Sequence, residues 1–207
     1  MPKVKGEASR AAMLNAARTI ILESGIEHLS HAAIAAQMSL SKSAVHWHFP
    51  TKRDLLTALV AEYVAHLETE EARHEAKYIA AGLTPVEAIL PGMRDWYEDF
   101  SRNAKGWVGI GASLIGLAQQ DPAITEPIRE WYRGLYCRLA TLNIEKTEVQ
   151  LAMMSFDAMF NTQKMGLSVL PEKEVLAIAD RILEHVFASR PALLATLNAI
   201  RQPTKSA

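Results

Sequence analysis

The segment from Ser30 to Leu55 constrains the fold more than any other part of the chain. Ser30 and Ser41 are good helix N-caps on either side of a short apolar stretch, so two short helices joined by a tight turn are expected. Thr51 and Asp54 have the spacing of a capping box that starts a longer helix. This combination is typical of a helix-turn-helix.

The rest of the chain is also predicted to be helical. Apolar residues recur at helical spacing in almost every segment, and no run alternates between apolar and polar residues. The expected helices cover about residues 9–24, 30–38, 41–48, 52–79, 85–103, 106–119, 121–142, 146–169 and 171–189, with a short last one from 191. The predicted fold class is therefore all-α, with nine to ten helices.

Composition and charge limit the classes of function. With 49% hydrophobic and 22% charged residues, the 207-residue chain can bury a core and is expected to fold throughout as a soluble, cytoplasmic protein without a membrane segment. Its first 55 residues carry seven Lys or Arg against four Asp or Glu, and the remainder carries fifteen against nineteen. A basic N-terminal part favours a polyanionic partner.

One set of residues is spread along the first quarter of the chain: Arg10, Met13, Leu14, Ala16, Ala17, Ile21, Gly25, Ser30, Ile34, Ala35, Leu40, Ser41, Lys42, His48, Phe49, Lys52 and Leu55. This set resembles the N-terminal domain of the tetracycline-repressor-like (TetR) transcriptional regulators. The ending His-Phe-Pro-Thr-Lys-Arg-Asp-Leu is its most specific part. The resemblance implies a helix-turn-helix DNA-binding domain over residues 1–55 and a helical effector-binding and dimerisation domain over 56–207.

Three positions depart from the family pattern. The turn that usually reads Ala-Gly is Met38-Ser39, the usual glycine early in the third helix is Ser43, and the usual tyrosine is His46. A left-handed Ser39 is expected to cost roughly 1 kcal/mol, which the fold can absorb. The family's operator preference therefore does not transfer to this chain.

The third helix is short enough for its first two turns to enter a DNA major groove, which is about 12 Å wide. Free backbone N–H groups where the second and fourth helices begin favour phosphate. The expected DNA-binding residues are Ser30, His31, Ser41, Lys42, Ser43, Ala44, His46, Trp47, His48, Thr51 and Lys52. Taken singly, each is equally a solvated cap or surface residue, and Trp47 is equally a helix-packing aromatic.

Large apolar side chains and several glycines lie between residues 96 and 161. By resemblance, these helices surround a pocket for a small, mainly apolar or aromatic effector. The expected ligand-binding residues are Trp96, Phe100, Trp107, Ile110, Leu114, Trp131, Met154 and Asn161. Close helix packing is the alternative for each of them.

The last two long helices carry apolar stripes suited to a four-helix interface in a homodimer. The expected interface residues are Leu151, Ala158, Met165, Ile178, Ile182 and Val186. A two-fold dimer would present two reading helices to a palindromic operator in double-stranded DNA. By resemblance, the function is that of a regulator, usually a repressor, which an effector releases from DNA.

Other classes of function have less support. No phosphate loop, nucleophile motif or carboxylate pair indicates an enzyme, and no catalytic residue or cofactor is expected. His28, His31, His46 and His48 lack the cysteine or acid that would complete a metal site. The competing hypothesis is a helical small-molecule sensor or partner-binding protein that has lost sequence-specific DNA binding.

Overall fold

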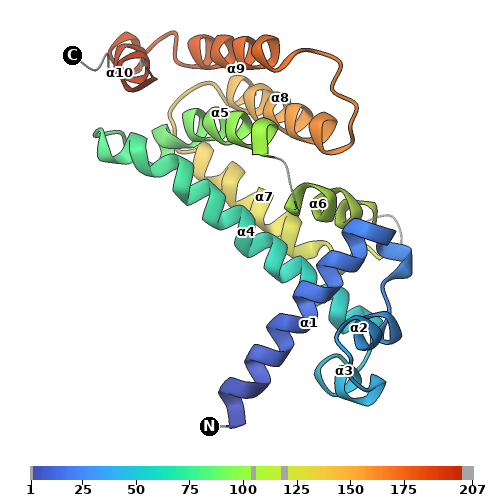
Figure 1. The fold of residues 1–207 in the computed structure, drawn as a ribbon. Coiled ribbons are helices and arrows are strands. Elements are labelled where there is room, and N and C mark those ends of the chain that lie inside the picture. Colours follow the sequence, from blue (N-terminus) through green and yellow to red (C-terminus); the bar gives the residue numbers. More distant parts are fainter. Residues whose placement is uncertain (1, 104–105, 118–120, 202–207) are drawn as a thin grey trace, which may run out of the picture. The chain divides into compact units, whose positions relative to one another are not determined.

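The computed structural model describes residues 2–103, 106–117 and 121–201, with side chains from residue 9 onward. Within these residues all regular structure is helical, which confirms the all-α prediction (Figure 1). The helices are α1 (Pro2–Ser24), α2 (His31–Gln37), α3 (Lys42–His48), α4 (Lys52–Ala80), α5 (Pro85–Asn103), α6 (Trp107–Gly116), α7 (Glu126–Leu139), α8 (Lys146–Lys164), α9 (Glu172–Val186) and α10 (Pro191–Arg201). A short 3-10 helix, η1 (Ile26–His28), follows α1.

Most helix ends lie close to the predicted ones, and the exceptions have local causes. Helix α7 begins at Glu126 rather than near 121, because Asp121 caps a turn in which Thr125 Oγ1 donates to the carbonyl of Pro122 at 3.1 Å. Helix α8 ends at Lys164 rather than near 169, because Gly166 adopts a φ of 67°. The predicted end of the sixth helix, near 119, lies outside the described residues.

The chain divides into two compact units. The first has the limits Met1–His66 and Lys105–Trp131, and the second has the limits Leu67–Ala104 and Tyr132–Ala207. Helices α4 and α7 each contribute to both. The predicted division after residue 55 concerns function and stays a prediction.

The first unit is built around α1. Helices α2 and α3 contact each other, and α1 contacts both α2 and α6 (Figure 1). The buried side chains that fill this core are Leu14, Ala17, Ile34, Val45, Phe49, Leu55, Leu59, Ile110 and Leu114. Gly111 on α6 lies so near Tyr63 that an added Cβ would stand 2.6 Å from the hydroxyl oxygen. Close helix packing therefore uses the space at this glycine.

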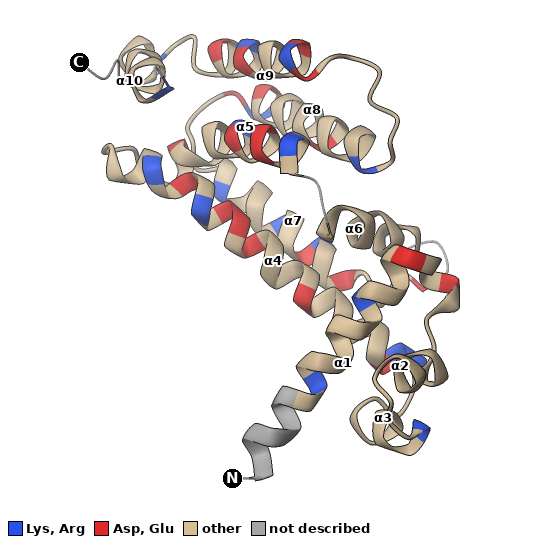
Figure 2. Ribbon diagram, in the orientation of Figure 1, with Lys and Arg blue, Asp and Glu red and all other residues tan. Residues whose placement is uncertain are grey.

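In the second unit, α5, α8 and α9 contact one another (Figure 1). Phe160 on α8 is the centre of an aromatic cluster, with ring centroids 5.3 Å from Trp96, 5.4 Å from Tyr97 and 5.1 Å from Phe100. Helices α4 and α5 carry both signs of charge along their lengths (Figure 2). Arg94 on α5 pairs with Asp180 on α9 at 2.9 Å. Apolar packing and ion pairs together join these helices.

Candidate functional site

The helix-turn-helix is held by capped helix starts and two buried contacts. Ser30 accepts a hydrogen bond from the Ala33 N–H at 3.1 Å, and Ser41 accepts one from the Ala44 N–H at 3.2 Å. Ile34 on α2 and Val45 on α3 are completely buried. The serine caps predicted from the sequence are therefore confirmed, and α3 is fixed against α2 by apolar packing.

The turn between α2 and α3 contains a left-handed residue. Ser39 has a φ of 54°, and the N–H of Leu40 donates to the carbonyl of Ala35 at 2.8 Å. Glycine adopts this conformation freely, whereas a residue with a Cβ pays roughly 1 kcal/mol. The turn keeps its closing hydrogen bond at Leu40 despite the absence of glycine.

The start of α4 is a reciprocal capping box. The Thr51 N–H donates to Asp54 Oδ2 at 2.9 Å, and the Asp54 N–H donates to Thr51 Oγ1 at 3.1 Å. Lys52 is exposed in the first turn. The predicted capping box is confirmed, and it leaves the Lys52 ammonium directed at solvent.

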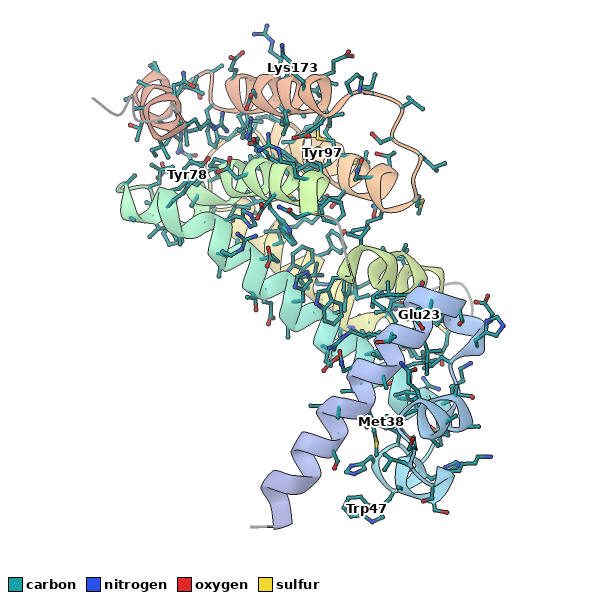
Figure 3. All side chains as sticks on the ribbon, viewed as in Figure 1. Glu23, Met38, Trp47, Tyr78, Tyr97 and Lys173 are labelled. Carbon is teal, nitrogen blue, oxygen red and sulfur yellow. The ribbon has the colours of Figure 1, made fainter. Side chains whose placement is uncertain are left out.

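Helix α3 presents an exposed polar face. Lys42, Ser43 and His46 are exposed, whereas Ala44 and His48 are half-buried. Trp47 is 78% exposed, and Figure 3 shows its side chain extending from the edge of the ribbon. Its main aromatic neighbour is His48, at a centroid distance of 4.8 Å. An indole this exposed does not serve the core of the unit.

The side chain of His31, at the start of α2, is buried. It is only 8% exposed, and its Nε2 donates to the carbonyl of Phe49 at 2.7 Å. The imidazole also lies flat against that of His46. The ring therefore supports α3 from within, through a hydrogen bond to a residue 18 positions further along the chain. The expected DNA contact of His31, at the start of α2 where backbone N–H groups are free, stays a prediction.

The comparisons with known proteins agree with this geometry. Residues 13–59 match the family model described as bacterial regulatory proteins, tetR family. The helix-turn-helix of this chain is therefore similar to that of the tetR family, and it is the DNA-binding part of a transcriptional regulator. No curated protein sequence matches the chain at a significant level.

Several solved structures share the fold of this chain. A transcriptional regulator from Rhodococcus sp. Rha1 is 20% identical, with a TM-score of 0.66 over 87% of this chain and 97% of that one. The multidrug binding protein EbrR, complexed with malachite green, is 18% identical, with a TM-score of 0.64 over 84% and 96%. NalD, a secondary repressor of a multidrug efflux pump in Pseudomonas aeruginosa, is 17% identical, with a TM-score of 0.56 over 89% and 96%.

Two further observations concern membranes and metal ions. Among the residues that the structure describes, no helix is long and apolar enough to cross a membrane. No group of three His, Cys, Asp or Glu side chains in the same residues is placed to hold a metal ion.

The predicted ligand-binding residues of the regulator fall into both units. In the first, Ile110 and Leu114 are buried, Trp131 is half-buried, and Trp107 stacks on His66 with centroids 5.1 Å apart. In the second, Trp96 and Phe100 both contact Phe160.

Met154, also in the second unit, is 65% exposed, so it does not line a buried site. The side chain of Met154 points away from the core of its unit, which corrects the expectation that it lines a pocket for the effector.

Helix α8 carries a row of polar side chains, of which the sequence analysis selected Asn161 as a ligand-binding residue. Asp157, Asn161 and Lys164 have helical spacing, and Asn161 Oδ1 is buried without a hydrogen-bond partner in the described structure. Burial raises the pKa of Asp157 to about 6, against a hydrogen bond from Tyr132 and the charge of Lys164. Burial lowers the pKa of Lys164 to about 8, against the charge of Asp157. Burying polar groups costs free energy unless they are hydrogen-bonded, and strongly shifted pKa values are common at functional sites.

The predicted dimer residues are mostly accessible. Leu151, Ala158, Met165 and Ile178 are exposed, and Ile182 is half-buried. Val186 is 4% exposed and belongs to the core of its own unit, so the expectation that it meets a partner chain is corrected. The exposed apolar face of α8 also includes Met154, and it continues into Leu167 beyond the helix end.

Proposed function

We propose that this regulator is a repressor that binds a palindromic operator as a homodimer and leaves it when a small effector binds. The observation that carries the proposal is the exposed face of α3, presented by a rigid, capped frame. Lys42, Ser43 and Trp47 point to solvent while Val45 and Phe49 fix the same segment in the core. A helix held in this way suits insertion into a major groove.

The proposed DNA contacts divide into two kinds. Ser30, Ser41, Thr51 and Lys52 hold phosphate, because they lie at helix starts where backbone N–H groups and a cation face solvent. Lys42, Ser43, Ala44 and His46 face base edges, with Trp47 and His48 against the sugar-phosphate backbone. The first kind of contact sets position on the duplex, and the second kind sets sequence preference.

Dimerisation is supported by the apolar face of α8. Leu151, Met154, Ala158 and Met165 are all exposed at helical spacing, and Ile178 on α9 is exposed as well. Apolar side chains gathered on one face favour an interface with a partner. A second copy of the chain, related by a two-fold axis, buries this face and places two copies of α3 on a palindrome.

The proposed effector is a small aromatic molecule that donates a hydrogen bond. The aromatic cluster around Phe160 supplies apolar contact, and Asn161, the next residue, has a buried carbonyl oxygen that accepts no hydrogen bond in the described structure. The fold shared with a multidrug binding protein that was crystallised with malachite green supports an aromatic ligand. Release requires that the effector bind the DNA-incompetent conformation more tightly.

The test uses the purified full chain and a library of randomised DNA duplexes. The expected result is enrichment of a palindrome, weaker binding as salt rises, and a scattering mass twice that of the chain. A pool that stays random would contradict the proposal and favour the alternative of a sensor that no longer reads DNA. A single enriched half-site bound by a monomer would contradict the homodimer.

A further inference from the structure

Four helices of the second unit pack around a common interior. Helix α4 contacts α5 through His74 and Trp96, whose ring centroids are 6.1 Å apart and whose planes differ by 15°. Trp96 in turn contacts Phe160 on α8, at a centroid distance of 5.3 Å. One side of the interior is therefore lined by aromatic rings from three helices.

Helix α7 joins α4 and α8 on the other side. Tyr132 on α7 donates a hydrogen bond to Asp157 on α8. Arg138 on α7 forms an ion pair with Glu75 on α4, with 2.9 Å between Nη2 and Oε2. The four helices thus follow one another in the order α4, α5, α8 and α7, which places α4 and α8 on opposite sides of the interior.

His74 on α4 has a buried ring nitrogen that makes no hydrogen bond. Its Nδ1 lies 2.7 Å from the carbonyl oxygen of Glu70, and a carbonyl oxygen only accepts, so Nδ1 carries the proton. In neutral His74 the other nitrogen, Nε2, bears a lone pair, and it has no hydrogen-bond partner among the described residues. Asp99 Oδ2 is 3.5 Å away, but an ionised carboxylate has no proton to donate. Nε2 is therefore an unsatisfied acceptor.

Asn161 on α8 supplies a second unsatisfied acceptor. Its Oδ1 is buried and likewise has no hydrogen-bond partner within the described part of the chain. Asn161 directly follows Phe160, and His74 stacks on Trp96, so the contact between these two aromatic rings connects the two acceptors. A buried acceptor costs free energy until a donor reaches it, and here two of them belong to opposite helices around one interior.

The charges beside Asn161 compensate each other. Asp157 lies four residues before it and Lys164 three residues after it, on the same face of α8. The Lys164 Nζ also lies 5.9 Å from the centroid of the Phe160 ring. One acid and one base on this face favour a ligand without net charge.

We propose that the effector is a flat, uncharged aromatic molecule with two hydrogen-bond donors, one for His74 Nε2 and one for Asn161 Oδ1. Its ring lies against Trp96 and Phe160. His74 and Asn161 are then specificity-determining residues, because an aromatic molecule with a single donor satisfies one acceptor and leaves the other unpaired. This inference rests on the proposed effector site and names the chemistry of its ligand.

The experiment compares three probes that share a naphthalene ring system. They are the naphthalenediol with one hydroxyl on each ring, the naphthol that lacks one of these hydroxyls, and the dimethoxy ether of the diol, which has no donor. Binding to the full chain is measured by isothermal titration calorimetry at about pH 7.5, where an ordinary histidine is neutral. The diol is expected to bind about five-fold or more tightly than the naphthol, and the ether more weakly than both.

Two variants remove the acceptors one at a time. His74→Phe keeps a ring against Trp96, and Asn161→Leu keeps a side chain of similar size. Each is expected to reduce the advantage of the diol over the naphthol to about two-fold or less, because the naphthol already satisfies the acceptor that remains. Urea denaturation checks that both variants fold, and loss of an unpaired buried acceptor should leave stability unchanged or raised.

Gln163→Leu is the matched control. It replaces a half-buried amide two residues further along α8, on another face of the helix, and it should keep the full advantage of the diol. A loss of the advantage in this variant as large as in Asn161→Leu would overturn the role of Asn161.

The outcomes separate this inference from the proposed function. Equal affinities for the diol and the naphthol in the unchanged chain would overturn the inference, and would indicate that bound water satisfies the two acceptors. Failure of all three probes to bind, or a diol advantage that survives in both His74→Phe and Asn161→Leu, would overturn it as well. In each of these cases a palindrome selected from randomised DNA would leave the proposed DNA binding in place. A diol advantage in a chain that selects no DNA sequence would support the ligand chemistry and contradict the repressor.

Discussion

Helix α3 in the first unit and helix α8 in the second carry polar groups in opposite settings. On α3, Lys42 and Ser43 are exposed, so water satisfies them until a partner arrives. On α8, Asp157 has a raised pKa and Asn161 has a buried oxygen without a hydrogen bond in the described structure. A surface that meets a polyanion can be built from solvated groups on a rigid frame. The proposed effector site is instead built from polar groups whose burial costs free energy.

The largest expected effect distinguishes a buried residue that holds α3 in place from an exposed residue that is proposed to contact DNA. Phe49 is 1% exposed, and Phe49→Ala should lower the free energy of unfolding by about 3–5 kcal/mol, measured by urea denaturation. Trp47→Ala, two residues earlier, should leave unfolding within about 0.5 kcal/mol. The same variant should weaken DNA binding at least about 10-fold, if the indole N–H meets a phosphate. Equal losses of stability in both variants would break the distinction.

A smaller expected effect distinguishes a lysine that contacts phosphate from a lysine that contacts base edges. Lys52→Ala should weaken binding to all duplexes by a similar factor and reduce the slope of log K against log salt by about 1. Lys42→Ala should in addition change which sequences are enriched. Binding isotherms at several salt concentrations, on the selected duplex and on a scrambled one, measure both effects. Losses that are equal and independent of salt would refute both roles.

The smallest effect concerns the interior of the second unit. The pKa of Asp157 is raised to about 6 in the folded chain, above the value of about 3.9 for an unperturbed aspartate. The folded state therefore binds more protons between these values, and stability falls as pH rises through the interval. Asp157→Asn should remove that fall and stabilise the chain by about 1 kcal/mol near pH 7.5, with little gain near pH 4.

Thermal unfolding of Asp157→Asn at both pH values checks this expectation. Ser155→Ala removes a half-buried, uncharged hydroxyl from the same helix; it is the control and should show the same pH profile as the unchanged chain. Destabilisation by Asp157→Asn at the higher pH would show that the carboxylate stabilises the fold rather than serving a ligand.

Local signals explain how far the sequence predicted the first unit. Ser30, Ser41 and the Thr51–Asp54 pair act on backbone groups three residues away, so their caps could be predicted from spacing alone. The burial of His31 could not, because its partner is the carbonyl of Phe49. A histidine at a helix start gives the same local pattern whether it faces DNA or the core.

In the second unit, sequence patterns did not determine which helix faces are buried. Asp157, Asn161 and Lys164 have the spacing of one helical face, which is equally typical of a solvated surface. Only the tertiary contacts of α8 show that this face is partly covered. The same reasoning applies to Val186, whose apolar character suits a partner chain and its own core alike.

The most direct test of the central claim, that the exposed face of α3 reads DNA sequence, is a ratio of affinities. The full chain is measured by fluorescence anisotropy, at physiological salt, against its selected duplex and against the same duplex with both half-sites scrambled. The account predicts that the selected duplex binds at least about 10³-fold more tightly. A ratio near one would contradict it and leave α3 as a surface that meets nucleic acid without reading it.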